Sequence, residues 1–167
     1  MMKPQRTAKY YYLKFLRLQG DPHSLALGVA IGLFIGVTPT IPLHTALVVL
    51  FCWILRGNLI AALIAATAIS NPITWIPQYH LSWYIGNQLI PGKLTWEKIK
   101  ELLDFLTSGA GIKESIAAIA QMGVDAIGVM VLGGILLAIP FTIGGYFFSF
   151  NFFATIRRKR SEKHILK

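Results

Sequence analysis

Two short polar stretches, each with two prolines, interrupt long apolar runs and carry the side chains best suited to hold a ligand. They are Val37-Thr38-Pro39-Thr40-Ile41-Pro42 and Ser70-Asn71-Pro72-Ile73-Thr74-Trp75-Ile76-Pro77. Proline breaks a helix, and backbone groups freed within lipid must be buried in protein or line a polar cavity. The pattern predicts a polar pocket between half-helices. Its predicted lining residues are Thr38, Pro39, Thr40, Pro42, His44, Asn71, Pro72, Thr74, Pro77 and His80.

The chemistry expected of such a pocket is the binding of an anionic headgroup such as a lipid phosphate. Helix ends supply N–H donors and a positive dipole, and the hydroxyl and amide side chains add neutral hydrogen-bonding groups. A second interpretation is that these side chains only cap the broken helices and satisfy their own backbone. His44 and His80 are either proton-coupling groups or internally bonded histidines near the interface.

Composition identifies a membrane protein. Hydrophobic residues make up 54% of the 167 residues and charged residues 14%, against roughly 25% charged in a soluble domain. The net charge of +9 comes from basic residues at the two ends of the chain, which argues against nucleic acid as a partner. The positive-inside bias predicts an inner-membrane protein with both termini in the cytoplasm. The predicted membrane-surface anchors are Lys14, Arg17, Arg157, Arg158, Lys159 and Arg160.

The chain is predicted to form one all-α membrane domain. A basic amphipathic segment (1–21) precedes paired broken-helix segments (22–92), an amphipathic connection (93–123), a transmembrane helix (124–153) and a basic tail (154–167). Glycines at 28, 32 and 36 share one helical face, which favours close approach of another helix. Arg56 marks a membrane boundary by snorkelling.

The two broken segments form an approximate repeat. Pro39 and Pro72 are 33 residues apart, and His44 and His80 are 36 apart. Paired interrupted segments are typical of transporters built from repeats, whose sites form where half-helices meet. If both termini are cytoplasmic, the region from Leu25 to Ile90 must cross an odd number of times. One broken crossing with one re-entrant hairpin satisfies this condition, and so do three short tilted crossings, and either places residues 93–114 outside.

Enzyme chemistry has no support in the motifs. The sequence contains no glycine-rich phosphate loop, no nucleophile–base constellation and no metal-ligand cluster, so we expect neither a catalytic residue, a metal nor a cofactor. Cys52 is the single cysteine, which excludes an intramolecular disulfide. Asp125, at the start of the last crossing, either pairs with a cation, caps the helix or takes part in transport.

The residues of the two breaks resemble a known family. Pro22-His23-Ser24, Pro39, Pro42 and His44, and above all Ser70-Asn71-Pro72-Ile73-Thr74 with Pro77, Tyr79 and Gly86, are similar to the bacterial domain-of-unknown-function family 2062. The resemblance covers roughly residues 16–150. It implies a small bacterial membrane protein without an established activity. Some members look like appendages to glycosyltransferase domains, which implies a lipid-linked sugar or lipid-carrier context.

Two functional hypotheses follow. In the first, the protein transports or translocates a small or lipid-phosphate substrate through a pocket at the two breaks. In the second, it is a non-catalytic structural or assembly subunit that docks a cytoplasmic partner, such as a glycosyltransferase, through its basic ends. The expected partners are membrane lipids, including anionic or lipid-carrier phosphates, with a homo-oligomer or a cytoplasmic enzyme as further alternatives.

Overall fold

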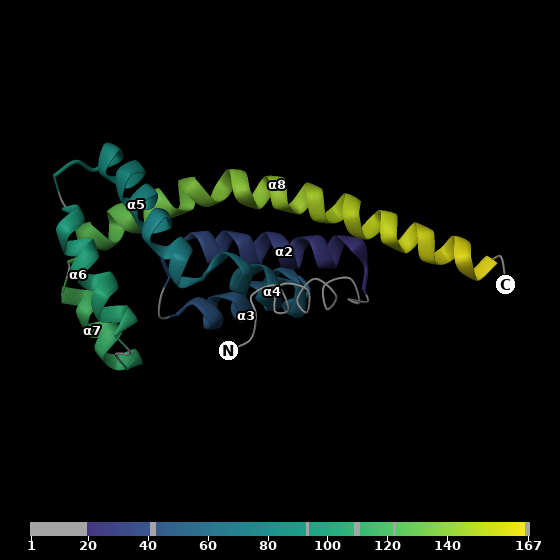
Figure 1. The fold of residues 1–167 in the computed structure, drawn as a ribbon, viewed down its shortest axis with the longest axis horizontal. Coiled ribbons are helices and arrows are strands. Elements are labelled where there is room, and N and C mark those ends of the chain that lie inside the picture. Colours follow the sequence, from purple (N-terminus) through teal and green to yellow (C-terminus); the bar gives the residue numbers. More distant parts are fainter. Residues whose placement is uncertain (1–19, 41–42, 93, 109–110, 122, 166–167) are drawn as a thin grey trace.

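The computed structural model describes residues 20–40, 43–92, 94–108, 111–121 and 123–165, which form seven helices and no strand (Figure 1). The all-α prediction is therefore confirmed for the described residues. The helices are α2 (Pro22–Val37), α3 (His44–Leu55), α4 (Leu59–Ile69), α5 (Pro72–Leu89), α6 (Trp96–Thr107), α7 (Ile112–Gln121) and α8 (Val124–Ile165).

Helix α8 is the element along which the others are arranged. It contains 42 residues and is about 63 Å long at roughly 1.5 Å per residue. Helix α2 packs along its C-terminal part and α5 along its N-terminal part, while α6 and α7 lie near its start (Figure 1). Within the described chain, Val124–Arg158 is the one continuous helical stretch long and apolar enough to cross a membrane.

Helices α2, α3 and α4 run back and forth beside one another. The end of α3 returns to the start of α2, where the Ser24 Oγ donates to the Arg56 carbonyl over 3.2 Å. Helix α4 then runs parallel to α2, with Gly28 facing Asn58 and Gly32 facing Ala62. A Cβ at Gly32 would overlap the Ala62 carbonyl oxygen. The glycine face predicted from the sequence is thus confirmed as a close helix contact.

Local chemistry sets the helix ends in this region. The Asp21 carboxylate accepts from the backbone N–H groups of His23 and Ser24 at 3.1 and 3.4 Å, which caps α2 directly before Pro22. Arg56 ends α3 in the left-handed conformation, and the Asn58 side chain caps α4 by accepting from the Ala61 N–H over 2.9 Å. The starts of α2 and α4 thus match the preference for aspartate and asparagine at the N-cap.

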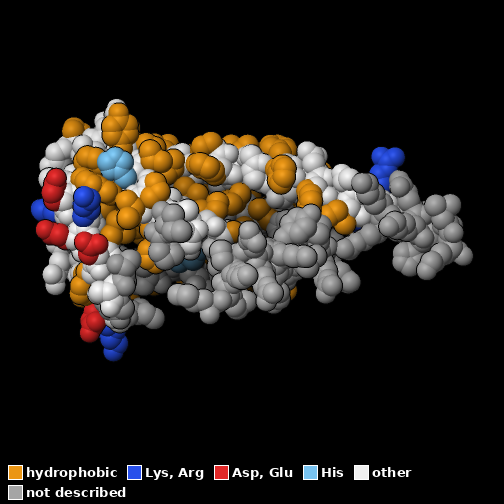
Figure 2. Space-filling model, viewed as in Figure 1, with side chains coloured by type: hydrophobic (Ala, Val, Ile, Leu, Met, Phe, Trp, Pro, Cys, Tyr) orange, Lys and Arg blue, Asp and Glu red, His pale blue; other side chains and the backbone are white. Residues whose placement is uncertain are grey.

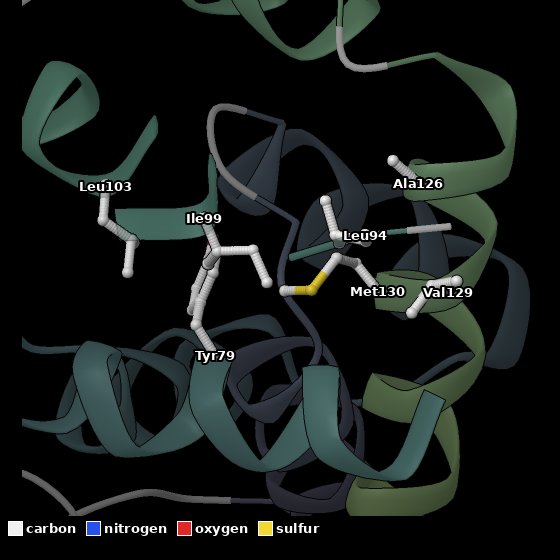
Figure 3. Packing of buried hydrophobic residues seen from close by; sticks show 7 residues of the cluster. All are labelled: Tyr79, Leu94, Ile99, Leu103, Ala126, Val129 and Met130. Atoms are coloured by element: carbon white, nitrogen blue, oxygen red, sulfur yellow. The ribbon is translucent and has the colours of Figure 1, made fainter. Parts of the chain in front are cut away.

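Buried apolar side chains form separate clusters at the two ends of the bundle. One cluster joins α2, α3 and α4 and consists of Ile31, Ile35, Val48, Cys52, Ala62 and Ala66. The other joins α5, α6 and α8, with Leu94 from the connection (Figure 3), and consists of Tyr79, Leu94, Ile99, Leu103, Ala126, Val129 and Met130. A third cluster holds Phe153 of α8 against α2 and α4. The core is therefore distributed along α8.

Two element boundaries differ from the sequence prediction. The second break was expected to extend to Pro77, but α5 begins at Pro72 and contains Pro77. Proline at 77 removes only the bond that its N–H would donate to the carbonyl of residue 73, near the start of the helix. In addition, α8 continues as a helix through the predicted basic tail to Ile165.

Candidate functional site

The two breaks lie side by side and share a hydrogen-bond acceptor. The Gly36 carbonyl, at the end of α2, accepts from the Ser70 Oγ over 3.3 Å and from the Gln78 Nε2 over 3.0 Å. The end of α2, directly before the first break, therefore contacts the second break at Ser70. Ser70 and Gln78 were not predicted to belong to this site, although Gly36 and Ser70 are 34 residues apart, which matches the repeat spacing.

Threonines in the first break bond to the end of α2. The Thr38 hydroxyl donates to the Phe34 carbonyl over 2.8 Å, and the Thr40 hydroxyl to the Ile35 carbonyl over 3.3 Å. His44 Nδ1 lies 3.4 Å from the Thr40 Oγ1. The Phe34 carbonyl also accepts the Thr38 backbone N–H over 3.1 Å, whereas the Ile35 carbonyl lacks such a backbone donor because residue 39 is proline. Pro39 lies against Gly134 of α8, and Pro42 is outside the described residues.

In the second break, Asn71 and Thr74 cap α5 reciprocally. The Thr74 N–H donates to the Asn71 Oδ1 over 3.3 Å, and the Asn71 N–H donates to the Thr74 Oγ1 over 3.2 Å. This is the geometry of a capping box. The Thr74 hydroxyl also bonds to the carbonyl groups of Ile69 and Asn71, and the Asn71 Nδ2 donates to the Ala68 carbonyl over 3.3 Å. The Asn71 and Thr74 side chains therefore bond to the backbone of this break and of the end of α4, whereas the Ser70 hydroxyl bonds across to α2.

The two predicted site histidines have different neighbours. His44 lies beside Thr40, whereas the ring of His80 packs on Trp83 and Trp96 at centroid distances of 5.6 and 4.6 Å. The Trp83 Nε1 donates to the Leu94 carbonyl over 2.8 Å, which fixes the ring between α5 and α6. The contacts of His80 thus connect it with α6, and Pro77 is exposed on α5.

Helix α5 carries the buried polar atoms that lack a partner. Among the described residues, these side-chain atoms are the Trp75 Nε1, the Ser82 Oγ and the Asn87 Oδ1. Trp75 lies in the first turn of α5, next to the second break, and Ser82 is fully buried where α5 approaches Gly133 of α8. A buried polar atom without a hydrogen-bond partner is costly. Helix α5 therefore carries more of this cost than the other described helices.

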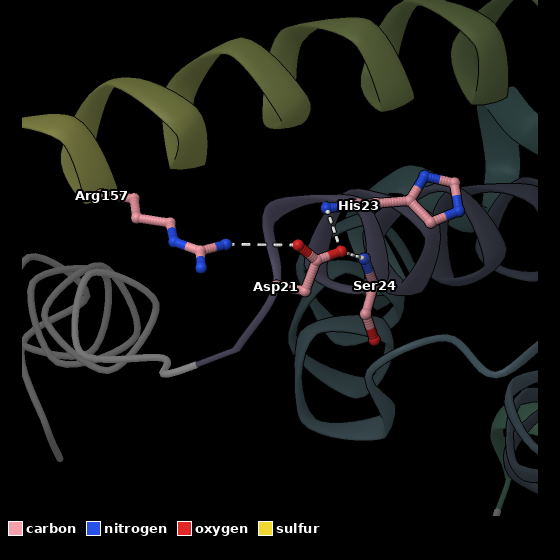
Figure 4. A network of polar contacts seen from close by, with 4 residues as sticks. All are labelled: Asp21, His23, Ser24 and Arg157. Carbon is pink, nitrogen blue, oxygen red and sulfur yellow. Dashed lines mark hydrogen bonds and ion pairs between the residues drawn. The ribbon is translucent and has the colours of Figure 1, made fainter.

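A second polar group lies at the other end of α2 (Figure 4). The Asp21 carboxylate, which caps α2, also pairs with the Arg157 guanidinium over 3.3 Å, and both side chains are more than 60% exposed. The His23 Nδ1 lies 2.8 Å from the Tyr146 hydroxyl. These contacts join the start of α2 to the C-terminal part of α8. The predicted anchors Arg158, Lys159 and Arg160 follow on the same helix, while Lys14 and Arg17 lie outside the described residues.

A separate hollow of about 340 Å³ lies between α6 and α7, and no predicted site residue lines it. Its lining residues are Lys98, Glu101, Leu102, Phe105, Ala118 and Gln121. Figure 2 shows acidic and basic side chains at this end and a basic side chain toward the far end of α8. No side chain coloured as acidic or basic lies between them in this view.

The described residues contain no group of three or more His, Cys, Asp or Glu arranged to hold a metal ion.

These observations define a class: an all-helical protein built around one helix that is long and apolar enough to cross a membrane. A family model described as "Uncharacterized protein conserved in bacteria (DUF2062)" matches residues 5–162. The chain therefore belongs to the DUF2062 family, as the residues of the two breaks predicted. No curated protein and no solved structure matches the chain.

Proposed function

We propose that this protein is a multi-pass inner-membrane protein with both termini in the cytoplasm. Arg56 is the one charged residue from 22 to 92, and no charged residue occurs from 126 to 156. Asp21 and Arg157 form an ion pair, and Ser24 bonds to the backbone of Arg56, so the charges that bound these segments meet at one end. That end fits the cytoplasmic interface.

In this placement, α2 and α3 form a re-entrant hairpin, and α4 and α5 form one broken crossing. Helix α3 returns to the end at which α2 begins, whereas Leu59–Ile69 and Thr74–Leu89 meet at 89° and lead on toward α6. Helix α8 then returns through the bilayer. From the basic end, α2 rises about 24 Å at roughly 1.5 Å per residue, so the breaks lie toward the far side of a hydrocarbon core about 30 Å thick.

Substituted cysteines test this topology. In a Cys52→Ala background, Glu101→Cys is expected to react with a membrane-impermeant maleimide added to intact spheroplasts, because α6 faces outward. Arg158→Cys should react only after the membrane is permeabilised. Labelling of both positions before permeabilisation, or of neither, would contradict the arrangement.

Within that membrane frame, we propose that the protein is a non-catalytic assembly subunit that docks an acidic cytoplasmic partner. The observation that carries this proposal is that the Thr38, Thr40, Asn71 and Thr74 side chains already bond to backbone groups of their own break or of the adjoining helix end, whereas Arg157 and Arg158 are exposed. Helix α8 extends beyond the start of α2 and carries Arg157 and Arg158 on a continuous helix to Ile165 (Figure 1). A basic helix held rigidly at the membrane surface suits recognition of acidic groups on a partner enzyme.

Charge replacement in the tail tests the docking role. Glutamine at all four positions from 157 to 160 is expected to abolish complementation of a deletion strain while membrane insertion and protein level stay normal. Lysine at the same four positions keeps the charge and should retain most of the function. Full complementation by the glutamine variant would contradict the proposal that the protein functions by docking a partner through its tail.

Translocation through the breaks is the second candidate, and Trp75 is the observation that favours it. Its buried indole N–H has no partner among the described residues and lies one turn after Asn71, beside the second break. A transported anion or lipid phosphate would supply the missing acceptor. Trp75→Phe removes this donor and keeps the ring. Loss of complementation by Trp75→Phe, with the glutamine tail variant still active, would favour translocation over docking.

A further inference from the structure

Arg56 occupies a backbone position that suits glycine better than arginine. Its φ of 57° and ψ of 31° are left-handed, and it is the one non-glycine residue with positive φ among the described residues. Left-handed backbone is unfavourable for an L-residue other than glycine, asparagine or aspartate. Residues held in such conformations tend to occur at functional positions. An arginine at this position therefore indicates a role for its side chain.

The neighbouring residues give Arg56 an amphipathic setting. Trp53 and Ile54, in the preceding turn, are 79% and 60% exposed, although both are strongly apolar. Gly57 follows, packed against Gly28 and Ile31 of α2, so the backbone of the turn is fixed on its inner side. The guanidinium has no hydrogen bond or ion pair with another residue that the structure describes. Within the described part of the chain, a cation without a side-chain partner thus lies beside exposed apolar side chains.

We propose that Arg56 binds the phosphate of an anionic phospholipid in the cytoplasmic leaflet. Guanidinium matches phosphate oxygens with two parallel hydrogen bonds. Trp53 and Ile54 then lie where the upper acyl chain of the same lipid runs, and tryptophan is favoured at that depth. This inference rests on the membrane placement proposed above and adds a defined lipid site at the tip of the α3–α4 connection.

The charges nearby favour an anion at this position. Asp21 is the acidic residue of this end among those described. Its carboxylate accepts from the Ser24 N–H, and the Ser24 hydroxyl donates to the Arg56 carbonyl. Arg157 pairs with Asp21 over 3.3 Å. Arg158 adds another positive charge on α8. The acidic side chain described at this end is thus already paired with Arg157, and the basic residues of this end favour anionic lipid in the adjacent leaflet.

A purely structural role for Arg56 makes a different prediction. A cation at the C-terminal end of a helix interacts favourably with the helix dipole, and this would explain arginine without any ligand. In that case Arg56→Gly should lower the thermal stability. If lipid binding is the role, Arg56→Gly relieves the left-handed strain and leaves the unfolding temperature equal or higher, while the lipid preference is lost.

The decisive experiment compares the wild type, Arg56→Gly and Arg56→Lys in nanodiscs of phosphatidylcholine with a minor fraction of phosphatidylglycerol. Native mass spectrometry after release measures the ratio of retained phosphatidylglycerol to phosphatidylcholine. The wild type is expected to retain phosphatidylglycerol preferentially, and Arg56→Gly should reduce this preference about fivefold, the effect of one basic residue at an anionic surface. Arg56→Lys keeps the charge without the bidentate geometry and should fall between them.

Three results would overturn the proposal. An unchanged lipid ratio in Arg56→Gly would remove the site, and a lower unfolding temperature with an unchanged ratio would assign Arg56 to the helix dipole. Stabilisation of the wild type but not of Arg56→Gly by inorganic phosphate, without phosphatidylglycerol, would assign the site to a soluble anion. Failure of the wild type to enter nanodiscs would instead contradict the membrane placement, which the cysteine labelling tests independently.

Discussion

The two broken-helix units have similar sequences but different shapes. In the first unit, α3 folds back along α2 and α4, and Val48 and Cys52 are buried against Ile31 and Ala62. In the second unit, α5 turns by 89° from α4 and packs on α8, where Ser82 and Gly86 meet Gly133 and Val129. The difference shows that a proline break permits a change of direction, and that the direction taken depends on the surface available for packing.

The length of each break contributes to this difference. Helix α2 ends at Val37 and α3 begins at His44, and this longer separation gives room for a reversal. Between α4 and α5 only Ser70 and Asn71 are non-helical, because Asn71 and Thr74 restart the helix at once by capping it. A hairpin and a bent continuous path therefore arise from related sequences.

Substitutions at the close glycine contacts should have the largest effects on stability, and they test the helix packing of each unit separately. Gly32→Ala places a methyl group on the Ala62 carbonyl oxygen, and Gly86→Ala places one on the Val129 carbonyl oxygen. Because backbone must move in both cases, we expect each to lower the free energy of unfolding by about 2 to 3 kcal/mol. Thermal unfolding in detergent, followed by tryptophan fluorescence, measures the loss.

Gly144→Ala is the matched control for these two substitutions. Gly144 lies in α8 with open space around its Cβ position, so alanine there should leave stability unchanged or raise it by up to about 1 kcal/mol. Equal losses at Gly32, Gly86 and Gly144 would contradict the proposed contacts. A loss at Gly32 without one at Gly86 would indicate that the α5–α8 contact is not formed.

The link between the breaks is tested by a double-mutant cycle at Gly36. Ser70→Ala or Gln78→Leu alone leaves the Gly36 carbonyl with one donor, so each should cost about 0.5 to 1 kcal/mol. The double variant leaves that carbonyl without a side-chain donor and should cost more than the two single losses combined. Strict additivity in thermal unfolding would mean that Ser70 and Gln78 do not share an acceptor.

The capping box of the second unit should have a smaller effect. Asn71→Ala removes the acceptor for the Thr74 N–H and is expected to cost about 1 kcal/mol. Asn71→Ser keeps an oxygen at the cap and should restore most of the stability. Hydrogen exchange localises the effect, which we expect in the first turn of α5. Faster exchange in α3 instead would show that the cap also supports the first unit.

The ion pair at the basic end should contribute least to stability. Arg157→Ala breaks the contact with Asp21, but both side chains are largely exposed, so the expected loss is below about 0.5 kcal/mol and shrinks in high salt. Arg157→Lys serves as the control that keeps the charge. A loss above about 1 kcal/mol by thermal unfolding would show that this contact helps to hold α2 against α8.

Patterns of short range determined much of the fold from the sequence alone. The Asp21 cap, the stop at Arg56-Gly57-Asn58 and the glycine face of α2 are each set by residues within a few positions of one another. The residues of the breaks also identified the family. Such features depend on backbone preferences and on helical spacing, which do not require knowledge of distant partners.

Tertiary structure decided how the two breaks are used. The sharing of the Gly36 carbonyl by Ser70 and Gln78, the packing of His80 on Trp96 and the packing of α5 on α8 all depend on contacts between residues more than ten positions apart. A hydroxyl or amide in the sequence has the same chemistry whether it binds a ligand or a nearby carbonyl. Only the packing of α2 against α4 and α8 selects which partner it meets.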